Sequence, residues 1–250
     1  MNVLILGSGA REHAIGWLLR KQNECAEIFI HPGNSGTLVS GFNSFPKERS
    51  VTQILEQASL NKIQLVVIGP ETFLAQGYAD TFRKAGFLVV GPDQVAAKLE
   101  SSKVFAKEFM QKAGIPTAPS HVFSSSEALK SFSNSHWPWV LKLDGLAAGK
   151  GVLVAQTEAD VNRFCDKVWN QESFGSGPHQ VLCEQFIRGQ EISYIGFCDG
   201  RSFVPLESAT DYKRLCDDNQ GPNTGGMGAV SPSPFLNPQL ESETKTDDLR

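Results

Sequence analysis

Residues 3–9, Val-Leu-Ile-Leu-Gly-Ser-Gly, decide the fold of this 250-residue chain. A short apolar run that ends in glycines, followed by apolar residues at helical spacing over 11–21, indicates a buried strand turning into a helix. Similar runs at 28–30, 65–68 and 87–90 also stop at Gly or Pro, and helical patterns at 51–59 and 78–85 lie between them. Residues 1–100 are therefore predicted to form a Rossmann-like parallel sheet of α/β class, which binds ligands beyond the carboxyl ends of its strands.

The composition is that of a globular protein, and it excludes several classes of partner. Lys and Arg total 23 against 27 Asp and Glu, and 40% of residues are hydrophobic. A formal charge of −4 provides no basic field for nucleic acid, and no apolar run approaches the roughly 20 residues that a membrane helix needs. The short N-terminal apolar run lacks the pattern of a signal peptide. Five scattered cysteines without a CxxC motif indicate reduced thiols in a cytoplasmic protein.

The remainder of the chain is predicted to form further units. A helix over 95–114 is followed by the breaking sequence Ile115-Pro116-Thr117-Ala118-Pro119, so 101–119 is expected to connect two domains. Residues 120–190 are expected to form a smaller α+β unit with strands at 139–143, 151–155 and 180–186. Residues 191–250 carry strand patterns at 192–198 and 202–206, a glycine-rich loop at 221–228 and a polar tail. No later element completes the sheet begun near residue 192, which suggests a truncated chain.

The loop Gly7-Ser8-Gly9 resembles the opening of a dinucleotide-binding motif but departs from it. Glu12 stands where the third glycine belongs, and the second strand ends at His31 instead of an acid. Arg11 begins the helix, and a cation is unfavourable at a helix N-terminus unless an anion is nearby. We therefore favour a phosphate monoester over NAD, with Glu71 facing the same edge. A tight turn without a ligand remains the alternative.

Lysines and a small-residue loop predict a nucleotide site further along the chain. Lys103 lies at the start of a helix, and Lys142 lies in a strand just before the loop Gly-Leu-Ala-Ala-Gly-Lys-Gly at 145–151. Such a loop lets backbone amides approach phosphate oxygens, and lysines neutralise them. A lysine among apolar strand residues is costly to bury unpaired, although it could instead extend its head to solvent. The strand and turn at 183–191 could present backbone groups to an adenine edge.

These features together strongly resemble the ATP-grasp superfamily and, within it, the phosphoribosylamine–glycine ligase family of purine synthesis. The segments that carry the resemblance are LILGSGAREHAIGW at 4–17, HPGNSGT at 31–37, VIGPET at 67–72, LKLDGLAAGKGV at 141–152 and DYKRLCDDNQGPNTGGMGAVSPSP at 211–234. Ala10 replaces a glycine that is usual in the family. The family's metal-binding Glu and Asn and its glycine-binding Arg lie beyond the last residue present.

The resemblance implies a Rossmann-like domain at 1–100, a linker at 101–119, an ATP-grasp lid at 120–190 and an incomplete ATP-grasp core at 191–250. It implies that ATP, glycine and 5-phosphoribosylamine react through glycyl phosphate to give glycinamide ribonucleotide, ADP and phosphate. A magnesium or manganese ion is expected for the full-length enzyme, with no metal ligands in this chain. Expected partners are these small molecules only, not nucleic acid or a membrane.

The resemblance also implies roles for individual residues, which fall into three groups. ATP is expected to contact Lys103, Lys142, Gly149, Lys150, Glu184, Gln185, Phe186, Ile187, Glu191 and Asn223. The other substrates are expected to contact Gly9, Arg11, Gly33, Asn34, Glu71, Asp211, Lys213, Thr224, Gly225 and Gly226. Catalytic roles fall to Lys142, Asp211, Lys213 and Asn223.

Two other functions remain open from the sequence. The chain could be another ATP-grasp carboxylate–amine ligase, although the segment at 211–234 favours the first family. It could also be a fragment that binds a nucleotide or a sugar phosphate without turnover, because the expected metal site is absent.

Overall fold

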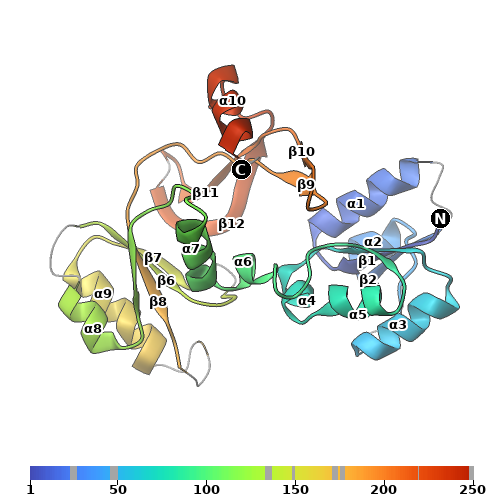
Figure 1. The fold of residues 1–250 in the computed structure, drawn as a ribbon, viewed down its shortest axis with the longest axis horizontal. Coiled ribbons are helices and arrows are strands. Elements are labelled where there is room, and N and C mark those ends of the chain that lie inside the picture. The colour runs from blue at the N-terminus through green and yellow to red at the C-terminus, as the bar shows by residue number, and fades with distance from the viewer. Residues whose placement is uncertain are drawn as a thin grey trace.

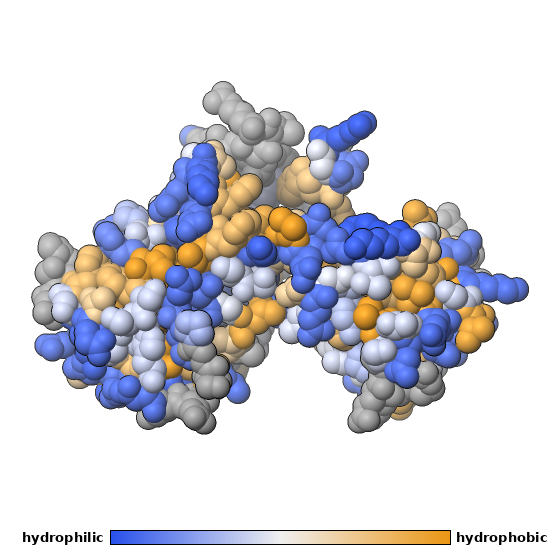
Figure 2. Space-filling model, turned by 60° about the horizontal axis from the view of Figure 1, so that its bottom comes forward, coloured by the Kyte–Doolittle hydropathy of each residue, from blue (hydrophilic) through white to orange (hydrophobic). Residues whose placement is uncertain are grey.

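In a computed structural model, the protein folds into two lobes that are joined by the segment around helix α6 (Figure 1). The structure describes residues 1–22, 27–45, 50–132, 137–147, 150–170, 174, 178–218 and 220–247, without the side chains at 222, 223 and 243–247. In space-filling form the two lobes are separated by a hollow at the lower edge of the view (Figure 2).

The N-terminal lobe contains a four-stranded parallel sheet in the order β2-β1-β3-β4, which confirms the predicted α/β class. Its strands are β1 (Val3–Gly7), β2 (Ile28–Pro32), β3 (Leu65–Ile68) and β4 (Leu88–Val90). Its helices are α1 (Ala10–Lys21), α2 (Ser35–Val39), α3 (Val51–Leu60), α4 (Glu71–Ala75) and α5 (Tyr78–Lys84).

Strand β1 is buried on both faces. Leu4 and Leu6 pack in one apolar cluster with Phe82, while Val3 and Ile5 pack in another with Ile30. A strand between two apolar layers has no polar face, so its sequence is a continuous apolar run without alternation. The segment 3–7 is therefore the centre of the lobe, and the loop that follows it lies at the sheet's carboxyl edge.

The second lobe contains an antiparallel sheet in the order β5-β8-β6-β7. Its strands are β5 (Ser120–Phe123), β6 (Trp139–Leu143), β7 (Val152–Ala155) and β8 (Val181–Gln185), and its helices are α8 (Ser126–Phe132) and α9 (Glu158–Cys165), the latter continued by a π-helical turn, η1 (Asp166–Asn170). Leu141 and Leu143 of β6 are buried in one core with Val161 of α9. Because side chains alternate along a strand, Lys142 lies on the opposite face of the sheet.

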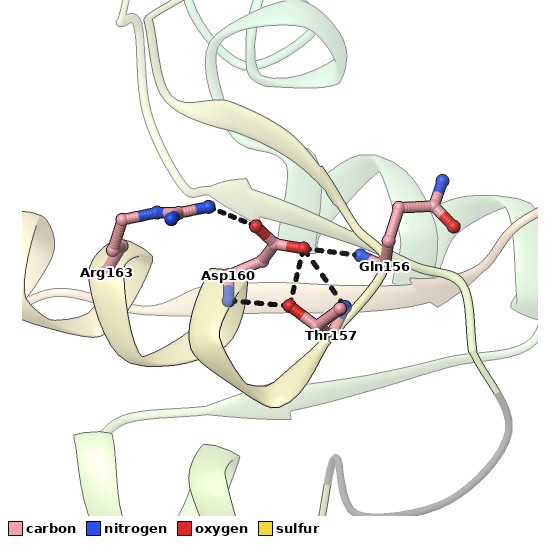
Figure 3. A network of polar contacts seen from close by, with 4 residues as sticks. All are labelled: Gln156, Thr157, Asp160 and Arg163. Atoms are coloured by element: carbon pink, nitrogen blue, oxygen red, sulfur yellow. Dashed lines mark hydrogen bonds and ion pairs between the residues drawn. The ribbon is translucent and has the colours of Figure 1, made fainter.

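Helix α9 is fixed at its N-terminus by a polar network (Figure 3). The Asp160 carboxylate accepts hydrogen bonds from the backbone N–H groups of Gln156 and Thr157 at 2.9 and 3.0 Å, and it pairs with Arg163. The hydrogen bond from Gln156 is the main reason that the pKa of Asp160 lies below its usual value. This capping box anchors the helix that covers the apolar face of the sheet.

The prediction of a single helix over 95–114 is wrong, because the chain forms two helices there, α6 (Lys98–Ser101) and α7 (Lys103–Lys112). Ser102 between them is extended, with φ −135° and ψ 115°, and its hydroxyl accepts a hydrogen bond from Phe105 N at 3.1 Å. A serine that caps the following helix satisfies the backbone there and competes with a continuous helix. The two lobes therefore meet at a non-helical residue.

The C-terminal part forms two hairpins and a helix. These are β9 (Gly196–Cys198) with β10 (Phe203–Pro205), β11 (Thr210–Cys216) with β12 (Gln220–Val230), and α10 (Pro238–Asp247). The strand predicted from residue 192 begins only at Gly196, although Ser193 forms an isolated bridge with Ala209.

The prediction of a glycine-rich loop at 221–228 is also wrong, because these residues belong to strand β12. Positive φ angles at Gly221 and Gly226, together with register shifts against β11, let the glycine-rich chain follow its partner irregularly. Glycine weakens an isolated strand, but it permits the backbone angles that this bulged pairing uses.

Candidate functional site

A cavity of about 550 Å³ lies at the carboxyl edge of the N-terminal sheet. Predicted residues Arg11 and Glu71 line it, and their side chains approach to 4.0 Å, between Nη2 and Oε2. The other lining residues are Gly69, Leu74, Pro92, Ala96, Ala97, Leu99 and Glu100. The sequence reasoning did not identify Glu100, whose place on the wall follows from the path of α6. The cavity thus offers one cation and two carboxylates at the edge where such sheets bind ligands.

Glu12 is the buried anchor of the Gly7–Gly9 loop. Its carboxylate accepts hydrogen bonds from the backbone N–H of Gly9 at 2.7 Å and from Arg11 Nε at 3.1 Å. The N–H of Gly9, a predicted phosphate contact, is therefore already bonded. The electrostatic argument that Arg11 needs a bound phosphate is also weakened, because Glu12 and Glu71 supply the opposing charge. The missing third glycine of the motif was the signal for this carboxylate.

Gly33 and Asn34 lie beside the same loop, but they are not among the residues that line the cavity. Gly33 donates its N–H to Gly7 O at 3.1 Å, and the Asn34 amide donates to Ser8 O at 2.8 Å. Asn34 Oδ1 accepts from Thr37 N at 3.0 Å, which caps α2. These contacts tie the ends of β1 and β2 together. Their proposed contact with substrate stays a prediction.

The start of α7 is joined to the end of β6. Lys103 Nζ donates to Gly145 O at 2.8 Å, at the beginning of the glycine–alanine loop. Asp144 accepts from Ser102 Oγ at 3.1 Å and from Val104 N at 3.0 Å. Predicted ATP residue Lys103 is therefore positioned at the base of the predicted lid loop. Asp144, which accepts hydrogen bonds from the residues on either side of Lys103, was not identified from the sequence.

Lys142 is held by a buried carboxylate on the face of the sheet opposite α8 and α9. Lys142 Nζ forms an ion pair with Glu184 of β8, and Lys107 of α7 pairs with the other oxygen of that carboxylate at 2.5 Å. We call these three residues the Lys107–Glu184–Lys142 triad. Burial alone would raise the pKa of Glu184, but hydrogen bonds from Lys107 and Lys142 outweigh it, so the pKa lies below its usual value.

The triad changes the interpretation of two predicted residues and adds a third. Lys142 is not buried without a partner, and the Glu184 side chain is engaged with lysines. Glu184 lies in β8 between β5 and β6, and Gln185 N donates to Pro119 O at 3.0 Å, so backbone contact with an adenine edge stays a prediction for the residues that follow, Phe186 and Ile187. Lys107 was not identified from the sequence. Its position four residues after Lys103 on one helix was the available signal, since such residues share a helix face.

A second group of predicted residues meets near hairpin β11–β12. Lys213 Nζ lies 3.1 Å from Glu191 Oε2 and 3.5 Å from Asp211 Oδ2. Thr224 Oγ1 donates to Lys213 O at 2.9 Å and accepts from Gly226 N at 3.1 Å. The hydrogen bond to Glu191 is the main cause that raises the pKa of Lys213 above its usual value. The structure therefore gathers predicted ribose, substrate and catalytic residues in one exposed cluster.

The remaining predicted residues are more dispersed. Lys150, Gln185, Ile187 and Gly225 are exposed, and Phe186 is half-buried. The backbone of Asn223 pairs with Arg214 across the hairpin, but its side chain lies outside the described part of the structure. Gly149 also lies outside the described residues.

The described ranges contain neither a cluster of metal-binding side chains nor a helix able to cross a membrane. Within them, no three or more His, Cys, Asp and Glu side chains are grouped so that they could hold a metal ion. Within the same ranges, none of the helices combines the length and apolar character needed to cross a membrane.

Comparison with known families gives two matches that together span nearly the whole chain. Residues 1–100 match the N domain of phosphoribosylglycinamide synthetase, and residues 101–249 match its ATP-grasp (A) domain. A curated phosphoribosylamine–glycine ligase from Chlorobaculum tepidum is 40% identical over 255 residues, covering 100% of this chain and 60% of that protein. The chain thus spans about 60% of the length of that relative.

Two solved structures support the same fold. The phosphoribosylamine–glycine ligase of Thermotoga maritima matches with a TM-score of 0.79 and 35% identity, over 100% of this chain and 60% of that one. The biotin carboxylase domain of Hydrogenobacter thermophilus 2-oxoglutarate carboxylase, solved with MgADP and bicarbonate, matches with a TM-score of 0.76 at 16% identity, over 99% of this chain and 56% of that one. The second likeness concerns the fold alone.

Proposed function

Because the chain belongs to the phosphoribosylglycinamide synthetase family, we propose that it serves the ATP-dependent ligation of glycine to 5-phosphoribosylamine in purine biosynthesis. The products are glycinamide ribonucleotide, ADP and phosphate. In this proposal residues 1–100 bind the sugar phosphate, and residues 101–119 connect this domain to the ATP-grasp part. Residues 120–190 form the lid over ATP, and residues 191–250 form part of the ATP-grasp core. We propose that this reaction takes place in the cytoplasm.

One observation carries this proposal. The wall of the 550 Å³ cavity includes Leu99 and Glu100, and three residues after Glu100 the same chain reaches Lys103 at the start of α7. Consecutive Cα atoms are about 3.8 Å apart, so the Cα atoms of Glu100 and Lys103 are separated by at most about 11 Å. A sugar-phosphate cavity and a phosphate-binding lysine are thus linked by one short segment, as a reaction between two bound substrates requires.

The proposed reaction has two balanced steps. A carboxylate oxygen of glycine attacks the γ-phosphorus, an O–P bond forms, and the bond to the β–γ bridging oxygen breaks to release ADP. The ribosylamine nitrogen then attacks the carbonyl carbon, a C–N bond forms, phosphate leaves and the nitrogen loses a proton. Lys103 and Lys142 neutralise phosphate charge during the first step. The loop at 145–151 excludes water, which would hydrolyse the acyl phosphate.

The N-terminal cavity holds the amine substrate in this proposal. The Arg11 guanidinium, whose side chain is well exposed, pairs with the phosphate or a hydroxyl edge of the sugar, and Glu71 accepts hydrogen bonds from hydroxyl or amine groups. The cluster of Glu191, Asp211 and Lys213 provides polar contacts to ribose and to glycine. No step is assigned to a metal ion, because the described residues offer no ligand set for one.

The proposal is tested by phosphate release from ATP in the presence of magnesium, glycine and freshly prepared phosphoribosylamine, with each omitted in turn. Release that requires all three substrates is the expected result for a chain with the complete catalytic site. For the 250-residue chain itself, calorimetry is expected to detect binding of ADP and, separately, of ribose 5-phosphate. Lys142→Ala is expected to weaken ADP binding and Arg11→Met to weaken ribose 5-phosphate binding, each by about tenfold for one lost charged contact.

Two results would overturn the proposal. One is the absence of ADP binding by the folded 250-residue chain. The other is tight binding of NADH at the Gly7–Gly9 loop, which would favour a dinucleotide-binding protein. Binding of ADP and ribose 5-phosphate without phosphate release would instead identify this chain as the binding part of the enzyme.

A further inference from the structure

The Lys107 ammonium is fully occupied inside the protein. Its side chain is only 4% exposed, and its three N–H groups are matched by three acceptors. These are Glu184 Oε1 at 2.5 Å, Thr117 Oγ1 at 2.6 Å and Ala118 O at 2.9 Å. An ammonium group has three donors and no acceptor, so Lys107 has no hydrogen bond left for a ligand.

Lys142 differs from Lys107 in both exposure and bonding. Its side chain is 32% exposed, and its ion pair in the triad is with Glu184. Glu184, with an 8% exposed side chain, divides its charge between the two lysines. Two ammonium groups and one carboxylate give the triad a formal charge of plus one. Lys142 is the more exposed of the two lysines, so its ammonium is the one that a ligand can reach.

We infer that Lys107 is a positioning residue for the nucleotide site: it offsets the charge of Glu184, so that Lys142 is held in place but keeps a positive charge for phosphate. Without Lys107, Glu184 and Lys142 would form a neutral pair, and the attraction for a nucleotide phosphate would fall. Lys107 would act only through Glu184 and would not touch the nucleotide. This inference rests on the proposed ATP site.

The experiment measures dissociation constants of the 250-residue chain for ADP and for adenosine, by competition against a fluorescent ATP analogue. Lys107→Met is expected to weaken ADP binding by about tenfold, the order expected for one unit charge a few ångströms from a phosphate. Adenosine binding should change by less than about twofold, because adenosine carries no phosphate charge. Lys112→Met, on the same helix but exposed, is the matched control and should leave both constants unchanged.

A double variant separates charge balance from simple support of the fold. Lys107→Met combined with Glu184→Gln removes both charges that cancel each other and leaves Lys142 charged. It is expected to recover part of the ADP affinity that Lys107→Met alone loses. If Lys107→Met alone loses its cooperative thermal transition, the double variant, which leaves no buried charge without a partner, is compared with the unaltered chain, and an equal loss of ADP and adenosine binding there would overturn the inference.

Three results would overturn the inference. They are unchanged ADP binding by Lys107→Met, an equal loss of ADP and adenosine binding, and a double variant that binds ADP as weakly as the single one. Each presupposes that the unaltered chain binds ADP. Failure of the unaltered chain to bind ADP would instead overturn the proposed function.

Discussion

Glu12 occupies the space in which a side chain at Gly69 would have to lie. A Cβ atom added at Gly69 would be 2.1 Å from Glu12 Oε1 and 2.6 Å from its Cγ and Cδ atoms. The end of β3 and the start of α1 are therefore packed against each other through a carboxylate and a glycine. The close approach explains why β3 is followed by a residue without a side chain.

Gly69→Ala is expected to destabilise the fold by at least about 2 kcal/mol, because the added methyl group must displace the buried Glu12 carboxylate from its hydrogen bonds. Urea denaturation gives the free energy of unfolding. Gly189→Ala is the control, since nothing lies within 4 Å of a Cβ there. In a Glu12→Ala background, the cost of Gly69→Ala should shrink, and an unchanged cost would contradict this explanation.

Asp144→Ala is expected to loosen the start of α7. The carboxylate accepts the N–H of Val104 and the hydroxyl of Ser102, so its loss should cost about 1–2 kcal/mol. Hydrogen exchange should show faster exchange of the Val104 and Phe105 amides. Asp199→Ala removes a similar turn carboxylate, which accepts from Arg201 N and Ser202 N, and should leave α7 unaffected. Unchanged protection at Val104 would show that the cap contributes little.

Stability is expected to fall in acid partly because of Glu184. Its pKa is lower in the folded protein than in the unfolded chain, so its contribution is present above the ordinary Glu value near 4.5 and is lost as pH falls through the lower folded value. Glu184→Gln should be less stable than the unaltered chain at pH 7, and the gap should narrow below about pH 4.5. Urea midpoints at several pH values measure this gap, and a constant gap would contradict the expectation.

The cysteines among the described residues should divide into two reactivity classes. Cys165 and Cys183 are buried, whereas Cys198 and Cys216 are exposed. Burial raises the pKa of Cys183 to about 12, so it carries almost no thiolate at neutral pH. Iodoacetamide at pH 7.5 should modify Cys198 and Cys216 and spare the buried pair until urea is added, as peptide mass spectrometry can show. Modification of Cys183 in the native state would mean that β8 opens readily.

The elements that sequence could predict are those whose pattern comes from local burial. Val3–Leu6 and Leu65–Ile68 are continuous apolar runs because both faces of a parallel strand are covered, and the glycines after them indicate a turn. The break at Ser102 was missed because the serine that caps α7 is also held by a hydrogen bond to Asp144, which is 42 residues away in the sequence. Strand β12 was missed because glycines disfavour strands unless a partner such as β11 supplies the pairing.

The same distinction applies to the site. The sequence could identify Lys103, Lys142 and Arg11 as candidate site residues. Each is a cation in unusual local surroundings, which the neighbouring residues in the sequence are enough to show. Lys107 acts through Glu184, a partner that the fold brings close, and Glu12 is packed against Gly69, which is likewise distant in sequence. Pairings of this kind depend on strand order and helix placement, which a pattern of residues does not specify.

The alternation in β6 couples folding fidelity to the position of the Lys142 charge. Leu141 and Leu143 enter the apolar core, and Lys142 between them faces the carboxylate of Glu184. A slip of one residue against β8 would drive the ammonium into that core and turn both leucines toward the charges. A misregistered sheet would therefore bury an ammonium group and also expose two leucines. A molecule whose apolar core has formed in the correct register has thereby also placed the Lys142 ammonium on the correct face.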